Sequence, residues 1–210
     1  MNYKEMIARK VASLFHPGDV VNLGIGIPTM VGNYICEGVW LHTENGLLGY
    51  TAAPEGREDA NFVGAGGQFL ATVQGSAAFD SATSFAIVRG GHLTATVLGA
   101  LEVDEAGNIA NWNRPGRVVG MGGAMDLVNG AKQVIVAMEH TAKGNKKIVK
   151  KCSLPLTGTG VVTKIVTELC VIDVSPRGLI LSELAEGVAI ADVLEKTDAE
   201  LIIPDQVGHF

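Results

Sequence analysis

One apolar run constrains the fold of this chain more than any other feature of its sequence. Residues 134–138 read Val-Ile-Val-Ala-Met, with no polar residue to form a solvent-facing side. A strand of this kind is typical of a parallel sheet that is covered on both faces. Further apolar strands are predicted at residues 19–24, 39–41 and 93–98, with helical stretches between them. This alternation predicts an α/β protein with three layers, in which a mostly parallel sheet lies between helices.

Helix and turn patterns complete the predicted outline. Apolar spacing and capping residues predict helices near residues 6–14, 31–34, 81–88 and 190–194, with Asp80 as the cap of the third. Antiparallel hairpins are predicted over residues 101–112 and around residues 176–178, whereas residues 51–61 are predicted to form a polar loop. No linker or repeat interrupts the chain, so residues 1–210 are predicted to form one domain.

Composition excludes several classes of protein. The net charge is −6 and no basic stripe is present, which argues against nucleic-acid binding. No run approaches the ~20 apolar residues of a membrane span, and no signal peptide is evident, so a cytoplasmic protein is expected. Five histidines lack metal-ligand spacing, which predicts no metal site. Three distant cysteines are expected to be reduced thiols: Cys36, Cys152 and Cys170.

One acidic residue, Glu44, is placed where chemistry is expected. It follows a short apolar strand and precedes Gly46 and Gly49, which are interpreted as turn residues. Ligands and catalytic groups gather at strand ends in α/β proteins. No Lys or Arg lies between Lys10 and Arg57, so no local cation neutralises this carboxylate. Glu44 is therefore either a reactive carboxylate, ionised at neutral pH near its reference pKa of ~4.3, or a turn-stabilising one.

Glycine-rich segments raise the question of a dinucleotide site. Gly24 and Gly26 follow a strand, and Glu44 lies twenty residues beyond Gly24, as in a nicotinamide-cofactor fingerprint. The third glycine is missing, however, and Pro28 occupies the start of the expected helix. Residues 120–125 also lack the third glycine of this fingerprint. A nicotinamide site is therefore excluded from the prediction.

An ordered set of motifs resembles one enzyme family over nearly the whole chain. Residues 41–49 (Leu-His-Thr-Glu-Asn-Gly-Leu-Leu-Gly) are similar to the glutamate signature of class I (3-oxoacid-type) coenzyme A transferases. The resemblance is closest to the β subunit of two-subunit bacterial acetate, butyrate or acetoacetate CoA-transferases. Further segments carry it in family order: residues 21–28, 64–68, 79–82, 89–92, 120–126, 137–140 and 154–157.

This resemblance implies a reaction and a set of site residues. CoA would move between short-chain acids (acetoacetate, acetate, butyrate or succinate) through an acyl-glutamyl anhydride and a glutamyl-CoA thioester at Glu44. Backbone amides at Gly122, Gly123 and Ala124 would contact the reacting glutamate or the thioester, although these residues also suit a plain strand-to-helix turn. Two further residues would support the active site: Asn22, which would orient the carboxylate, and Gln68.

The resemblance also implies partners. CoA would be a substrate, with no tightly bound cofactor, and an α subunit would complete the site, as an α2β2 heteromer. Two other functions stay open: an acyl-CoA hydrolase with the same nucleophile, and a non-catalytic nucleotide- or sugar-phosphate-binding module.

Two polar segments keep alternative interpretations. Glu139 and His140 form either a structural pair at a strand end or a catalytic pair. The basic segment 143–151 is either a solvated loop and strand edge or a contact to a CoA phosphate.

Overall fold

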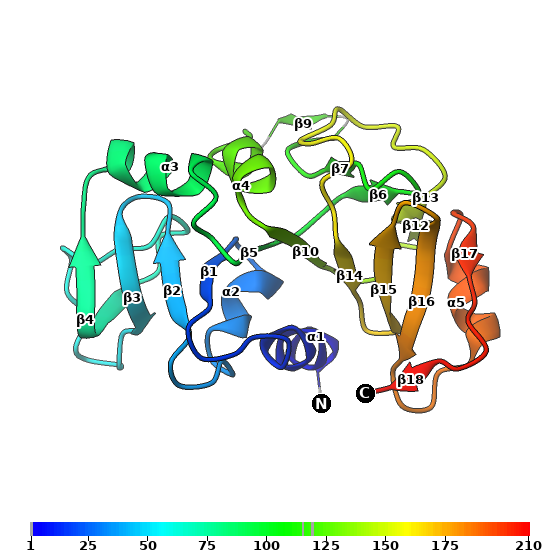
Figure 1. Cartoon of the computed structure of the whole chain (residues 1–210), viewed down its shortest axis with the longest axis horizontal. Helices are drawn as coiled ribbons and strands as arrows, with labels where there is room; N and C mark the ends of the chain where they lie inside the picture. Colours follow the sequence, from blue (N-terminus) through cyan, green and yellow to red (C-terminus); the bar gives the residue numbers. More distant parts are fainter. Residues whose placement is uncertain (1, 115, 119) are drawn as a thin grey trace.

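A computed structural model describes residues 2–114, 116–118 and 120–210 (Figure 1). Eleven strands form one mixed sheet, and its centre consists of five parallel strands. In spatial order these are β14 (Lys164–Val166), β10 (Gln133–Ala137), β5 (Ala95–Leu98), β1 (Val20–Leu23) and β2 (Trp40–Thr43). The prediction of a mostly parallel sheet is thereby confirmed.

Antiparallel strands extend the sheet on both sides. Beyond β2 lie β3 (Leu47–Ala52) and β4 (Leu70–Ala78), each antiparallel to its neighbour. Beyond β14 lie β15 (Cys170–Ser175) and β16 (Gly178–Leu184), which form the hairpin predicted around residues 176–178. Two short strands then pair parallel to β16: β17 (Leu201–Ile202) and β18 (Gly208–His209).

Helices cover both faces of the sheet, as the apolar run at residues 134–138 predicts. Along β10, Val134 and Val136 belong to one buried cluster, whereas Ile135 and Ala137 belong to the other. The first cluster includes residues of α3 (Ser81–Arg89), α4 (Ala124–Gly130) and α5 (Ile190–Lys196). The second includes residues of α1 (Tyr3–Ala12) and α2 (Ile27–Val31). Figure 1 shows α1 and α2 across the sheet from α3 and α4.

In the part of the chain that the structure describes, three small sheets lie outside the main one. The predicted hairpin at residues 101–112 is present as β6 (Glu102–Asp104) and β7 (Ile109–Ala110), which β13 (Ile148–Val149) extends. The Asp104 carboxylate accepts hydrogen bonds from the N–H groups of Ala106 and Asn108 (both 3.1 Å) and so fixes the turn. The other two are β8 (Asn113–Arg114) with β9 (Arg117–Val118), and β11 (Thr141–Ala142) with β12 (Asn145–Lys146).

The structure differs from the sequence prediction in one helix boundary and in two strands. Helix α2 begins at Ile27, four residues before the predicted start, because proline is well accommodated in the first turn of a helix and Pro28 occupies it. Strands β3 and β4 were not predicted. Gly49 lies inside β3, not at a turn, at a shift in the pairing with β4. Its φ of +79° and the Trp40 ring, 2.9 Å from where a Cβ would lie, both require glycine there.

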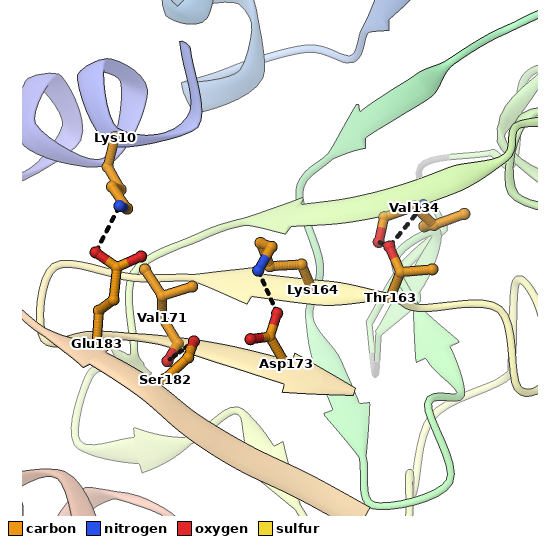
Figure 2. A network of polar contacts seen from close by, with 8 residues as sticks. All are labelled: Lys10, Val134, Thr163, Lys164, Val171, Asp173, Ser182 and Glu183. Atoms are coloured by element: carbon orange, nitrogen blue, oxygen red, sulfur yellow. Dashed lines mark hydrogen bonds and ion pairs between the residues drawn. The ribbon is translucent and has the colours of Figure 1, made fainter. Parts of the chain in front are cut away.

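Polar contacts stabilise the half of the sheet formed by β10, β14, β15 and β16, and one of them links this half to α1 (Figure 2). Lys10 of α1 forms an ion pair with Glu183 of β16 at 2.6 Å, and Lys164 pairs with Asp173 across β14 and β15. The Thr163 hydroxyl donates to the carbonyl of Val134 (3.0 Å). These contacts hold the half of the sheet that lies away from Glu44. No helix in the described ranges is both long and apolar enough to cross a membrane.

Candidate functional site

A cavity of about 540 Å³ lies where the parallel strands β1, β2 and β5 reach their carboxyl ends. This is the position at which open parallel sheets bind ligands. All six residues that the sequence analysis selected line this one cavity: Asn22, Glu44, Gln68, Gly122, Gly123 and Ala124. The structure thus brings together segments up to 102 residues apart, from Asn22 to Ala124, and their chemical roles stay predictions.

Glu44 owes its place to a tight turn after β2. The N–H of Gly46 donates to the carbonyl of Thr43 (3.0 Å) and closes the turn. Gly46 has φ of +117°, and a Cβ there would overlap the carbonyl oxygen of Phe79. Only glycine suits both conditions, so the chain returns into β3 and leaves the half-buried Glu44 side chain at the cavity.

The Glu44 carboxylate lies directly against the backbone of Gly123. The backbone N–H of Gly123 lowers the pKa of this carboxylate. A Cβ at position 123 would overlap Oε2 of Glu44 and would lie 2.8 Å from its Cδ and 3.0 Å from Cζ of Phe85. The neighbouring Ala124 N–H donates instead to the carbonyl of Met121 (3.1 Å). Of the predicted backbone donors, Gly123 is therefore the one seen to face the carboxylate.

The surroundings of Glu44 oppose its ionisation. Burial raises the pKa of Glu44 above its ordinary value, the Gly123 hydrogen bond lowers it, and the charge of Asp126 raises it further. Asp126 itself pairs with Arg89 at 2.7 Å. The pKa of Glu44 is therefore higher than the reference value expected from the sequence, because the turn carries the side chain out of bulk water.

A glycine-rich loop at residues 64–67 is tied to the Glu44 turn. The N–H of Ala65 donates to the Thr43 hydroxyl (3.3 Å), which in turn donates to Asn45 Oδ1 (2.5 Å). A Cβ at Gly64 or Gly66 would lie within 2.7 Å of the Gln68 amide group. The glycines therefore leave the room that the Gln68 side chain occupies at the cavity wall.

A buried polar network that the sequence analysis missed supports Asn22. The Asn22 Nδ2 group donates to the backbone carbonyl of His42 (3.1 Å) and lies 3.3 Å from His42 Nδ1. On the other side of the ring, His42 Nε2 lies 3.0 Å from the Ser84 hydroxyl. His42 is fully buried, and burial lowers its pKa to about 4. The signal in the sequence was His42 itself, a polar residue that directly follows the apolar residues of a predicted buried strand.

The other polar candidates lie away from the cavity. His140 is buried between the hydroxyls of Thr167 (3.0 Å) and Thr197 (2.9 Å), while Glu139 is exposed, 3.8 Å from Lys4. This arrangement favours the interpretation as a structural strand-end pair.

The basic segment 143–151 does not line this cavity. The cavity-lining set contains no member of residues 143–151. In that segment, burial lowers the pKa of Lys147 to about 8, against the charges of Glu139 and Glu168. Within the described ranges, His, Cys, Asp and Glu side chains form no group of three with metal-binding geometry, and the cysteines are free thiols.

The fold and the cavity define a class: an α/β protein with one half-buried carboxylate among glycine-rich loops at the carboxyl ends of parallel strands. Comparison with known proteins makes this specific. The family model described as "Coenzyme A transferase" matches residues 4–196. The chain is 52% identical to the beta subunit of the acetate CoA-transferase of Haemophilus influenzae over 209 residues, 98% of this chain and 94% of that protein.

Two further likenesses agree. The chain is 50% identical to one subunit of the probable succinyl-CoA:3-ketoacid coenzyme A transferase of Bacillus subtilis, covering 97% of this chain and 96% of that protein. Its fold is similar to that of an acyl-CoA transferase of Escherichia coli O157:H7, with a TM-score of 0.80 at 23% identity. That likeness covers all of this chain but only 43% of the solved one. The chain belongs to the coenzyme A transferase family.

Proposed function

We propose that this chain is the subunit of a CoA-transferase that carries the nucleophile, Glu44, and that it moves CoA between short-chain carboxylic acids. The supporting observation is the Glu44 carboxylate at the cavity, half-buried and in contact with the Gly123 N–H. The acid class rests on the relatives, which are named for acetate and for succinyl-CoA with a 3-ketoacid. Acetoacetate and butyrate are further acids of the same size.

Covalent catalysis by a carboxylate accounts for every bond that changes. The Glu44 carboxylate attacks the thioester carbonyl, the C–S bond breaks, and an acyl-glutamyl anhydride and a CoA thiolate result. The thiolate then attacks the glutamyl carbonyl, which releases the first acid and forms a glutamyl-CoA thioester. The carboxylate of the second acid then attacks the glutamyl-CoA carbonyl, which forms a second anhydride and expels the CoA thiolate. The thiolate attacks the acyl carbonyl of this anhydride, so that the second acid leaves as its CoA thioester and the Glu44 carboxylate is released. No net proton transfer is needed, so no general base is required.

Gly123 has the geometry to assist these steps. Each attack places negative charge on a carbonyl oxygen, and a preorganised N–H donor is worth about 3–4 kcal/mol there in favourable cases. The Gly123 N–H already contacts the Glu44 carboxylate, so it lies beside the glutamyl carbonyl that the thiolate attacks. Asn22, Gln68, Gly122 and Ala124 line the same cavity.

An α subunit is proposed to close the cavity. The matched relatives are named as subunits, and an α2β2 assembly is the arrangement we expect. Large apolar side chains are exposed at or beside the cavity: Ile25 is 73% exposed, Phe69 45% and Met121 41%. Apolar surface of this kind commonly marks a protein interface. A cytoplasmic location stays a prediction.

Exchange kinetics with the co-expressed α subunit test this proposal. Glu44→Gln should abolish CoA exchange between acyl-CoA and a second acid while the heteromer still assembles. Glu139→Gln is the matched control, because Glu139 is an exposed glutamate outside the cavity-lining set. Full exchange by Glu44→Gln would overturn the proposal. CoA release at the same rate with and without a second acid would instead identify a hydrolase.

A further inference from the structure

The orientation of the Asn22 side chain is fixed by its neighbours. An asparagine NH₂ group has two donors and no acceptor, and here one donates to the His42 carbonyl (3.1 Å). The other faces His42 Nδ1 (3.3 Å), which must therefore be the unprotonated, accepting nitrogen. Turning the amide over would place Asn22 Oδ1 against the His42 carbonyl oxygen, two acceptors in contact. The hydrogen-bond network thus assigns Nδ2 to the protein interior.

His42 is held in the tautomer that this arrangement needs. With Nδ1 as acceptor, the neutral ring carries its proton on Nε2, which donates to the Ser84 hydroxyl of α3 (3.0 Å). Asn22 and His42 are direct register partners on β1 and β2, so their side chains lie on the same face of the sheet. Both residues are buried, at 3% and 0% exposure. The pair is therefore built into the sheet two residues before Glu44.

The remaining polar atom of the Asn22 side chain is its carbonyl oxygen, Oδ1. Asn22 lines the cavity, and among the described residues Oδ1 accepts no hydrogen bond. Among the described residues, Thr96 Oγ1 is a side-chain polar atom that is both fully enclosed and without a hydrogen-bond partner, and Asn22 Oδ1 is not such an atom. Asn22 Oδ1 therefore reaches the open space of the cavity. An acceptor there suits an N–H donor.

We propose that His42 is a positioning residue, which holds Asn22 so that Oδ1 accepts a hydrogen bond from the first amide N–H of the pantetheine arm of CoA. This inference rests on the proposed function, since it needs a CoA thioester in this cavity. The pantetheine arm carries a secondary amide two carbons from the sulfur, so an acyl group at Glu44 brings that N–H into the same cavity. A thioester without this N–H loses the contact.

A matched pair of substrates tests the proposal in the assembled heteromer. One is the acetoacetyl thioester of N-acetylcysteamine, and the other is the thioester of 2-acetoxyethanethiol, in which an oxygen replaces the N–H. Wild type should prefer the first in kcat/KM by about three- to tenfold, the worth of one neutral hydrogen bond. Asn22→Leu should reduce this preference to about one, and His42→Leu should reduce it in the same direction.

Conservative and remote variants separate positioning from general damage. His42→Asn should retain much of the preference, because an asparagine Oδ1 can accept near the position of Nδ1. His140→Leu is a buried histidine substitution outside the cavity and should leave the preference at the wild-type value. Since the preference is a ratio within each variant, a partly folded preparation does not alter it. If Asn22→Leu fails to fold, His42→Leu, compared with His42→Asn, provides the loss of preference that the proposal requires.

Failure of the inference differs from failure of the proposed function. An equal kcat/KM for the two thioesters in wild type, or an unchanged preference in Asn22→Leu, overturns the role of Asn22 while CoA exchange still depends on Glu44. Exchange that survives in Glu44→Gln overturns the proposed function, whatever the preference between the two thioesters.

Discussion

Two buried histidines of this molecule have similar surroundings but lie beside different parts of the fold. His42 and His140 are both fully buried, both lie between two polar side chains, and burial lowers the pKa of each to about 4. The network of His42 ends at Asn22, which lines the cavity beside Glu44. The network of His140 ends at Thr167 and Thr197, which connect the ends of β14 and α5. Burial and pKa are therefore alike for the two histidines, whereas the residues that their hydrogen bonds reach differ.

The comparison predicts that changes on the cavity side lower turnover. Apart from Glu44 itself, the largest such effect is expected at Gly123. Gly123→Ala places a methyl group on Glu44 Oε2, and misplacing a reacting group by about 1 Å can lower the rate ~100-fold. The measurement is kcat for CoA exchange in the heteromer, with the melting temperature measured alongside.

Gly208→Ala is the matched control for Gly123→Ala. Gly208 lies in β18, outside the cavity-lining set, and the atom nearest to its added Cβ would be Cγ of the Glu183 side chain at 3.1 Å. This variant should turn over near the wild-type rate. Near-normal kcat in Gly123→Ala would mean that the contact with Glu44 has no part in the reaction.

On the other side of the comparison, His140→Leu should lower stability and leave catalysis unchanged. It removes the hydrogen-bond partner of two buried hydroxyls, at an expected cost of about 2 kcal/mol in the free energy of unfolding. Urea unfolding measures the loss, and kcat for the folded fraction should match wild type. A tenfold drop in kcat with unchanged stability would contradict the structural assignment of His140.

An effect of similar size is expected on the pH dependence of stability. The pKa of each buried histidine is about 4 in the folded chain, below the ~6.5 of an unfolded one, so the unfolded state binds more protons between these values. Stability is therefore full above pH ~6.5 and falls as the pH drops towards 4, by up to about 1.4 kcal/mol per pH unit for each histidine.

His140→Leu should remove one of these two contributions. Urea unfolding of wild type and the variant, compared at pH 7 and pH 5, measures the difference. Equal pH dependence in the two proteins would show that His140 does not titrate as its burial requires.

The sequence predicted the centre of the fold and the members of the cavity better than it predicted their connections. Apolar runs such as residues 134–138 identify buried parallel strands because both faces of the sheet are covered. Strand β4 escaped prediction because most of its residues are exposed, so it lacks an apolar pattern. The contact between His42 and Ser84 joins residues 42 positions apart on a strand and a helix, and no local pattern encodes it.

Mapping the covalent intermediate tests the central claim most directly. The assembled heteromer is incubated with acetoacetyl-CoA alone, without a second acid, then denatured at low pH, digested and analysed by mass spectrometry. The account predicts CoA in thioester linkage to the peptide that contains Glu44, and no adduct in Glu44→Gln. An adduct on another residue, or none in an enzyme that exchanges CoA at full rate, would contradict it.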